Sequence, residues 1–235
     1  MKDYVKTEQG YAYEYPRAAV TTDSVIFGFD GLELQVLLIK RGGEPYKDCW
    51  AFPGGFLEMN ESVEQCAFRE LKEETGLEPE QMEQFGVFSA VDRDPRGRVI
   101  TVAFYALIKK EQVAGGDDAA DARWFPINAL PSLAFDHSEM LREALAALKR
   151  DIYHQPVGFR LLSEQFTMPQ LQRLYEAILG EQFDRRNFQK KMLSTGILEE
   201  QGIARSTGHR PGRLFSFKKE NYEQMKESDS SAKEF

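Results

Sequence analysis

The residues best suited to chemistry in this sequence lie in one stretch, GFLEMNESVEQCAFRELKEETGL, which covers residues 55–77. Glu70, Glu73 and Glu74 are spaced i, i+3 and i+4, so a helix would place them on one face. Carboxylates that share a face repel one another unless a cation lies between them. Mg²⁺ takes oxygen ligands, keeps several waters and shares the phosphates of its substrates. The spacing therefore predicts a site for a divalent metal and a diphosphate, where the metal neutralises phosphate charge and activates a water.

These carboxylates need a helix, and the sequence marks both of its ends. Ser62, with Gln65 three positions later, forms a capping box at its start. Gly76 is suited to the left-handed residue that ends a helix. Arg69 precedes Glu73 by four residues and is expected to hold it as an ion pair. A solvated acidic face is the usual meaning of a glutamate-rich run, and the spacing of the whole stretch argues against that meaning here.

Apolar and β-branched runs predict the elements that support this helix. The first two runs are joined by Asp30-Gly31, which is a strong hairpin signal. A later run carries apolar side chains at helical spacing. The predicted strands cover residues 18–29, 32–39, 85–91, 99–108 and 124–126, and the predicted helix covers residues 138–149.

Length and charge favour two modest domains in the 235 residues. Residues 1–152 hold 17 basic and 27 acidic side chains, whereas residues 153–235 hold 13 and 11. An acidic first part with a basic second part suggests two tasks, the second involving an anion such as nucleic acid. We expect a first domain over residues 1–152, a linker at 151–157, a second domain over 153–225 and a disordered tail at 226–235.

The sequence also bounds the compartment. It holds no apolar run near the ~18 residues that a transmembrane helix needs. Its polar and aromatic start is unlike a signal peptide. Two cysteines are too few for a disulfide framework. A cytoplasmic protein without membrane contact is therefore expected.

The second part predicts two helices followed by a basic hairpin. Thr167 with Gln170 forms another capping box, and Asp184 caps a second helix. Residues 197–201 and 214–217 are two short predicted strands around a basic loop, which is the plan of a winged helix-turn-helix. Its second helix would enter the major groove, where Arg, Asn and Gln side chains read base edges, and the wing would contact phosphate. The alternative is a small helical domain with a solvated basic face. The candidate DNA-binding residues are Arg185, Arg186, Asn187, Gln189, Lys190, Arg205, His209, Arg210 and Arg213.

These features together carry a family resemblance. Residues 55–77 satisfy every position of the Nudix box, and Trp50 to Gly55 is similar to the strand and turn that precede that box. With the second part included, nearly the whole chain resembles the NrtR-like family of Nudix-related transcriptional regulators. The resemblance implies an α/β fold, in which a Nudix-type mixed sheet is sandwiched by helices and followed by a small winged helix-turn-helix domain.

The resemblance also implies roles for the residues of the box. Glu70 and Glu74 are the expected Mg²⁺ ligands, Gly55 offers its backbone carbonyl, and Glu73 is a ligand or a base. Glu61, in the supporting loop, and Arg69 complete the candidate catalytic set with Glu73.

An effector site is implied beside the box. The family pattern makes Arg41 a candidate phosphate contact, and Arg93, Arg96 and Arg98 could contact phosphate or ribose. A solvated turn is the alternative for those three arginines. His137, which precedes a predicted helix, is a candidate ligand contact or a capping and packing residue.

The implied function is a homodimeric repressor of genes of NAD metabolism. ADP-ribose would be the effector, and its binding would release a palindromic double-stranded operator. Because the box is complete, two other functions stay open. One is a Mg²⁺-dependent ADP-ribose diphosphatase, and the other is a bifunctional repressor that hydrolyses its own effector.

Overall fold

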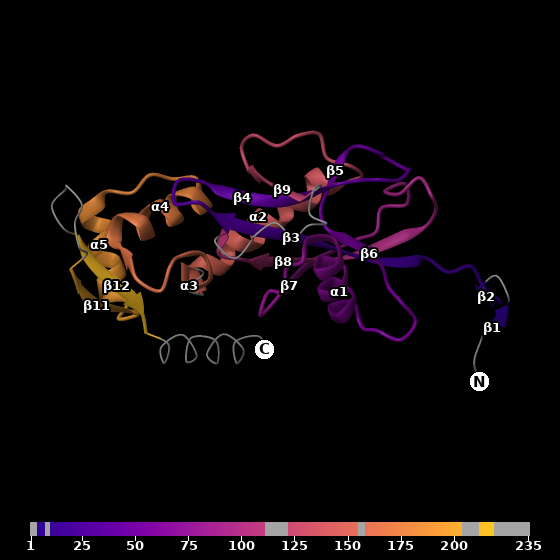
Figure 1. The fold of residues 1–235 in the computed structure, drawn as a ribbon, viewed down its shortest axis with the longest axis horizontal. Helices are drawn as coiled ribbons and strands as arrows, with labels where there is room; N and C mark the ends of the chain where they lie inside the picture. The colour runs from indigo at the N-terminus through magenta and orange to yellow at the C-terminus, as the bar shows by residue number, and fades with distance from the viewer. Residues whose placement is uncertain (1–3, 8–9, 111–121, 155–157, 204–211, 219–235) are drawn as a thin grey trace.

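A mixed seven-stranded sheet forms the centre of the first part of the chain, as Figure 1 shows. The structure is a computed structural model, and it describes residues 4–7, 10–110, 122–154, 158–203 and 212–218. The main strand order is β5-β4-β3-β8-β7, with β6 paired to β3 and β9 paired to β4. β3 pairs parallel with β8 and antiparallel with β4, so the sheet is mixed. The strands are β3 (Ala19–Phe29), β4 (Leu34–Lys40), β5 (Trp50–Ala51), β6 (Gly54–Phe56), β7 (Glu83–Phe88), β8 (Val99–Leu107) and β9 (Ala122–Pro126).

Helices cover both faces of this sheet. Successive residues of a strand point to opposite faces. Phe27 therefore packs in the cluster that holds α2 (His137–His154), while Ile26 packs with Leu71 of α1 (Val63–Thr75). The expected sheet between helices is confirmed.

Local signals placed the ends of these elements correctly. Asp30 accepts hydrogen bonds from the backbone N–H groups of Leu32 and Glu33, and Gly31 has φ 94°, so the predicted turn joins β3 to β4. Ser62 caps α1 in a complete capping box, and Gly76 ends that helix at φ 71°.

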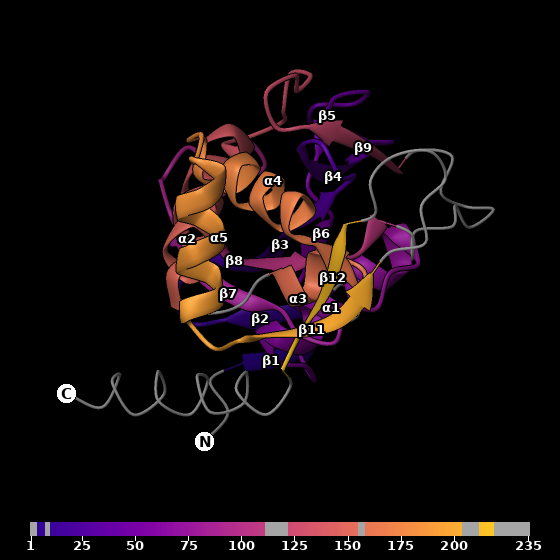
Figure 2. The same ribbon diagram turned by 90° about the vertical axis from the view of Figure 1, so that its left-hand side faces the viewer.

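The second part is a winged helix-turn-helix, which confirms the expected fold. Figure 2 looks onto this end of the molecule, where α4 and α5 cross beside the strands of the wing. β12 lies between β10 and β11 in a three-stranded antiparallel sheet. Its elements are α3 (Gly158–Leu161), β10 (Phe166–Thr167), α4 (Met168–Leu179), α5 (Arg185–Ser194), β11 (Leu198–Ile203) and β12 (Arg213–Phe217).

The structure departs from the sequence-based expectations in several elements. An N-terminal hairpin of β1 (Tyr4–Thr7) and β2 (Gly10–Tyr13) was not predicted, nor were α3 and β10. α2 continues to His154, through the first residues of the expected linker, because Ile152 is buried and anchors its last turn. β7 begins before the predicted strand and ends at Phe88. Residues 155–157 and the expected tail lie outside the described residues.

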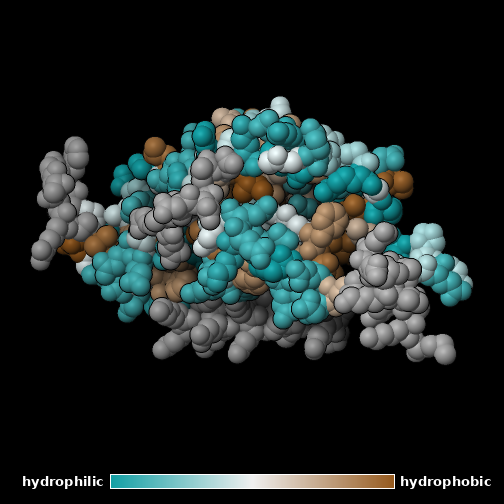
Figure 3. Space-filling view, turned by 45° about the vertical axis from the view of Figure 1, so that its right-hand side comes forward, coloured by the Kyte–Doolittle hydropathy of each residue, from teal (hydrophilic) through white to brown (hydrophobic). Residues whose placement is uncertain are grey.

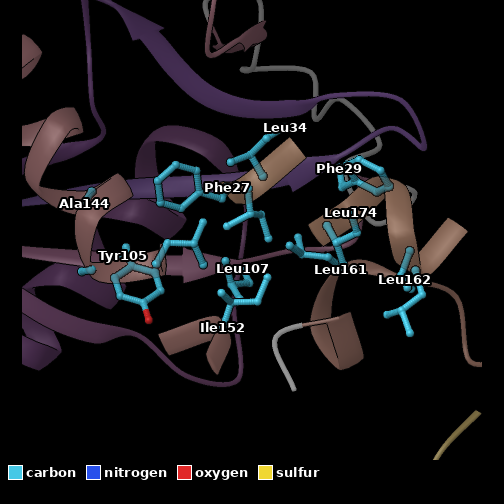
Figure 4. Packing of buried hydrophobic residues seen from close by; sticks show 14 of the residues in the cluster. Phe27, Phe29, Leu34, Tyr105, Leu107, Ala144, Ile152, Leu161, Leu162 and Leu174 are labelled. Atoms are coloured by element: carbon cyan, nitrogen blue, oxygen red, sulfur yellow. The ribbon is translucent and has the colours of Figure 1, made fainter. Parts of the chain in front are cut away.

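The two parts of the chain share one hydrophobic core. Figure 4 shows Phe29, at the end of β3, close to Leu174 of the second part, and Leu34, Leu161 and Leu162 belong to the same cluster. The face seen in Figure 3 is mainly hydrophilic, and its apolar residues lie in separate patches. No helix in the described ranges is long and apolar enough to cross a bilayer.

Candidate functional site

The box helix α1 lies with its carboxylates against the Gly54-Gly55 turn at β6. The backbone N–H of Gly54 donates to Oε2 of Glu74 at 2.8 Å. A β-carbon on Gly55 would lie 2.2 Å from Oε1 of Glu70, so this carboxylate rests directly on the glycine. Any β-carbon at Gly55 would displace the Glu70 carboxylate from the turn, which accounts for the glycine at this position of the box.

Arg69 is the centre of an ion-pair network. Its Nε and Nη2 atoms donate to the two oxygens of Glu61 at 2.9 and 2.6 Å. Its Nη1 atom donates to Glu70 at 2.8 Å and to Glu73 at 3.2 Å, which is the predicted i, i+4 pair. The hydrogen bonds from Arg69 are the main reason that the pKa of Glu61 falls to about 2. Arg69 thus fixes Glu61 and Glu70 relative to each other.

Glu74 is a largely buried carboxylate whose pKa is raised. Its pKa is raised to about 7, mainly by burial; the charges of Glu70 and Asp23 also raise the pKa, while the hydrogen bond from the Gly54 N–H lowers it. A nearby cation would reverse this shift, because it stabilises the ionised form. The position is therefore suited to a carboxylate that is ionised when a metal is bound.

The donor set fits a hard divalent cation. Glu70 and Glu74 offer carboxylate oxygens beside the Gly54-Gly55 turn. The backbone carbonyl of Gly55 in this turn is another predicted metal ligand. In the described part of the chain, however, no three His, Cys, Asp or Glu side chains already converge as a metal cage. Glu73 lies apart from the turn, with 59% of its side chain exposed and its charge on Arg69. Metal binding by Gly55, Glu70, Glu73 and Glu74 remains a prediction, and Glu73 lies at the edge of this group.

A polar pocket of about 120 Å³ opens beside these carboxylates. It brings together four of the five predicted effector-binding residues, namely Arg41, Arg93, Arg96 and His137. The fifth, Arg98, lies apart and donates to the carbonyl of Ser89 at 2.8 Å. The other lining residues are Thr21, Asp23, Ile39, Phe52, Gly54, Gly55, Phe56, Asp94 and Phe135.

The arginines of this pocket differ in how freely they can meet a ligand. Arg93 has a side chain that is 4% exposed, and its Nε and Nη2 atoms donate to the two oxygens of Asp136 at 2.9 and 2.7 Å. Arg96 pairs with Asp94, and its guanidinium lies 5.0 Å from the ring centroid of Phe56. Arg41 lies similarly over Phe135, at 4.8 Å. Arg96 and Arg41 are accordingly the more accessible cations.

His137 is a buried neutral residue at the floor of the pocket. Its Nδ1 accepts from the backbone N–H of Phe52 at 3.0 Å, and its Nε2 lies 3.5 Å from Oδ1 of Asp23. Burial lowers its pKa, although the charge of Asp23 opposes the shift. The imidazole therefore positions Phe52 and the start of α2, which agrees with the capping and packing alternative.

Several residues of this site were not predicted from the sequence. Asp23 contributes a carboxylate near His137 and Arg93, and an acidic residue inside an otherwise buried strand was the available signal. Phe135 has a left-handed backbone at φ 52° and stacks near two guanidinium groups. Asp136 lies 43 positions from Arg93, a pairing that only the tertiary fold creates.

The second helix of the winged domain, α5, presents a polar and basic face. Asp184 caps it by accepting from the N–H of Asn187 at 2.9 Å. Phe188 and Met192 face inwards. Arg185, Arg186, Asn187 and Lys190 are exposed and Gln189 is half-buried. In the wing, Arg213 is exposed and pairs with Glu200 at 3.3 Å, whereas Arg205, His209 and Arg210 lie outside the described residues.

Comparison with known proteins covers both parts of the chain. Residues 18–146 match the NUDIX domain, and residues 158–217 match the NrtR DNA-binding winged helix domain. The ADPR responsive transcriptional repressor NtrR of Acinetobacter baylyi is 35% identical over 218 residues, which cover 89% of this chain and 86% of that protein. The ADP-ribose pyrophosphatase of Methanocaldococcus jannaschii is 44% identical over 129 residues, or 55% of this chain and 74% of that enzyme.

Solved structures show the same two-part architecture. Shewanella oneidensis NrtR complexed with a 27mer DNA has a TM-score of 0.71 and 32% identity, covering 85% of this chain and 93% of that one. The NUDIX domain of the same protein, complexed with ADP ribose, has a TM-score of 0.51 and 32% identity, covering 57% of this chain and 90% of that domain. The order of the domains and the extent of these matches lead to one conclusion: the chain belongs to the NrtR family of Nudix-related transcriptional regulators.

Proposed function

We propose that this protein is a transcriptional repressor that releases its operator when ADP-ribose binds to the Nudix domain. One observation carries the proposal: a cationic pocket beside the Nudix box and an exposed basic recognition helix lie in a single chain and share one core. The Acinetobacter relative is named as a repressor responsive to ADP-ribose, and the Shewanella structures contain DNA and ADP ribose. We further propose that the regulated genes belong to NAD metabolism and that the protein acts in the cytoplasm.

The pocket chemistry supports a nucleoside diphosphate sugar as ligand. Arg96 and Arg41 supply positive charge for a diphosphate, and arginine binds phosphate oxygens in a bidentate manner. Phe56 and Phe135 lie against these guanidinium groups and present aromatic surface to a purine or a ribose. Arg93 and His137 line the same space but are engaged with Asp136 and Phe52, so we assign them to shaping the pocket.

Mg²⁺ would be held by Glu70, Glu74 and the Gly55 carbonyl. When bound, it would neutralise part of the diphosphate charge. Arg69 holds Glu70 in position by a direct hydrogen bond, and Glu61 in turn fixes Arg69 by accepting two hydrogen bonds from it. Glu73, which is mostly exposed, remains available as a base.

Hydrolysis of ADP-ribose is the second candidate function. The complete box and the 44% identity to the Methanocaldococcus enzyme favour it. The expected products are AMP and ribose 5-phosphate, and Glu73→Gln should abolish their release. Retained DNA binding together with such turnover would make the protein bifunctional.

Selection of duplexes from a random pool tests the repressor proposal without assuming a regulon. We propose a homodimer, because two half-sites separated by about 34–36 Å require a two-fold protein. The expected result is an enriched palindrome that also occurs upstream of genes of NAD metabolism. A monomer in sizing with light scattering, with no enrichment of any sequence, would contradict the proposal.

A further inference from the structure

The helix that starts in the effector pocket ends against the DNA-binding helices. α2 has 18 residues, so it is about 27 Å long. Its first residue, His137, lines the pocket beside the Nudix box. Its last turn carries Ile152 into a hollow of about 590 Å³, which is also lined by Phe188 and Met192. These two residues form the buried face of α5, so the two ends of α2 lie beside the two sites.

The pocket end of α2 is fixed by Arg93. The backbone carbonyl of Asp136 accepts a hydrogen bond from the N–H of Met140 at 3.1 Å, in the first turn of the helix. The carboxylate of Asp136 accepts hydrogen bonds from both Nε and Nη2 of Arg93. The same guanidinium donates from Nη1 to the hydroxyl of Thr101 on β8 at 2.6 Å. A ligand that shifts Arg93 therefore acts directly on the start of α2.

The body of α2 is fully buried on one side. Met140, Ala144 and Leu148 are 0% exposed and belong to the core that α2 shares with Leu171 and Leu174 of α4. Figure 1 shows α2 running along the sheet towards α4. Close-packed interiors transmit small displacements, because their side chains have no free volume into which to relax.

The far end of α2 is bonded to β8 a second time. The Tyr105 hydroxyl donates a hydrogen bond to Oδ2 of Asp151, in the last turn of α2. Burial raises the pKa of Tyr105 and the charge of Asp151 raises it further, so the phenol stays protonated and able to donate. Thr101 and Tyr105 both belong to β8, so this strand holds α2 at its two ends through Arg93 and through Asp151.

We propose that Tyr105 and Asp151 are positioning residues of the allosteric response, since they hold the last turn of α2 in the place where it supports α4 and α5. The inference rests on the proposed function. Neither residue lines the effector pocket or belongs to the recognition helix. With the bond between them removed, ADP-ribose and DNA each still bind, and the effect of one on the other is lost. This is a change in coupling between two sites and leaves each affinity intact.

The test measures the ratio of the Kd for DNA with ADP-ribose to the Kd without it. Loss of a merely structural contact would leave this ratio unchanged. Fluorescence anisotropy gives the Kd of the full chain for a duplex that it selects from a random pool, with and without saturating ADP-ribose in Mg²⁺. Tyr105→Phe and Asp151→Ala, which remove the donor and the acceptor of the bond, should each reduce the ratio of these two Kd values about tenfold relative to wild type. The double variant should be no worse than either one, because both changes break the same bond. Arg142→Gln is the matched control, since Arg142 lies on α2 with 68% of its side chain exposed.

The outcomes separate this inference from the proposed function. A wild-type protein whose DNA affinity ignores ADP-ribose refutes the repressor proposal itself, and the inference with it. A responsive wild type, with both variants retaining the full ratio, overturns the inference alone. Variants that lose DNA affinity without ADP-ribose, or that melt far below wild type, also overturn it, because the bond would then serve the fold.

Discussion

Gly55→Ala is the perturbation that most directly tests the role of the Gly54-Gly55 turn. The new β-carbon would lie 2.2 Å from Oε1, 2.3 Å from Cδ and 2.5 Å from Oε2 of Glu70. Contacts so short cannot exist, so the Glu70 carboxylate must move away. It is the end of a flexible side chain, and the main loss to stability is its hydrogen bond to Arg69. A charged hydrogen bond that is partly open to solvent contributes about 1 kcal/mol, so Tm should fall by only ~2–4 °C.

The loss of affinity should be much larger than the loss of stability. Displacing a group that orients or forms a metal site typically weakens binding by ~10–100-fold. Titration calorimetry with ADP-ribose in Mg²⁺ should show that Gly55→Ala loses affinity in this range. In EDTA, the affinity of Gly55→Ala for ADP-ribose should differ little from that of wild type. Gly43→Ala is the neutral control, because its β-carbon meets nothing within 4 Å. Gly54→Ala is a control that should lose stability, because its β-carbon would lie 2.1 Å from the backbone oxygen of Thr22. Unchanged affinity of Gly55→Ala in Mg²⁺ would refute the assignment of Glu70 as a ligand.

Three further predictions follow from the same structure. Arg186→Ala should weaken binding to the selected duplex by about 1–3 kcal/mol and leave ADP-ribose affinity unchanged, and joint loss of both would indicate misfolding instead. Asp184→Ala removes the cap of α5 and should lower stability by ~1 kcal/mol in thermal melts, with recovery in Asp184→Asn. The pKa of Glu74 rises from 4.5 to about 7 on folding, so its contribution to stability is complete below pH 4.5 and declines as pH rises through 7. Metal-free Glu74→Gln should therefore be more stable than wild type at pH 8, by up to about 3 kcal/mol, and equal near pH 4; equal stability at both pH values would contradict the burial argument.

Some features of the fold could be predicted because their signals are local. The hairpin at Asp30-Gly31 and the caps at Ser62 and Gly76 depend on residues within a few positions of one another. α3 and β10 were not predicted, because they depend on contacts with distant parts of the chain. β10 exists because Phe166 pairs with Phe215 on a distant strand and is buried at 1% exposure.

In the candidate site, some residues could likewise be predicted from local spacing, whereas others depend on the tertiary fold. The box residues follow from spacing along one helix, since Arg69, Glu70 and Glu74 lie on consecutive turns of α1. The partners of Arg93 and His137 are 43 and 85 positions away, so their engagement with Asp136 and Phe52 arises only in the folded chain. Arg98 shows the converse: its closeness in sequence to Arg96 suggested a shared site, yet it bonds the carbonyls of Ser89 and Ala90 instead.

Control of DNA binding by ADP-ribose can be tested in a single titration. Wild-type protein is bound to its selected, labelled duplex in Mg²⁺, and ADP-ribose is added while anisotropy is followed. AMP with ribose 5-phosphate is the control, because these products would accumulate if the protein hydrolysed its effector. We expect ADP-ribose to release the duplex and the products to leave it bound. Anisotropy that stays constant at saturating ADP-ribose would contradict this expectation.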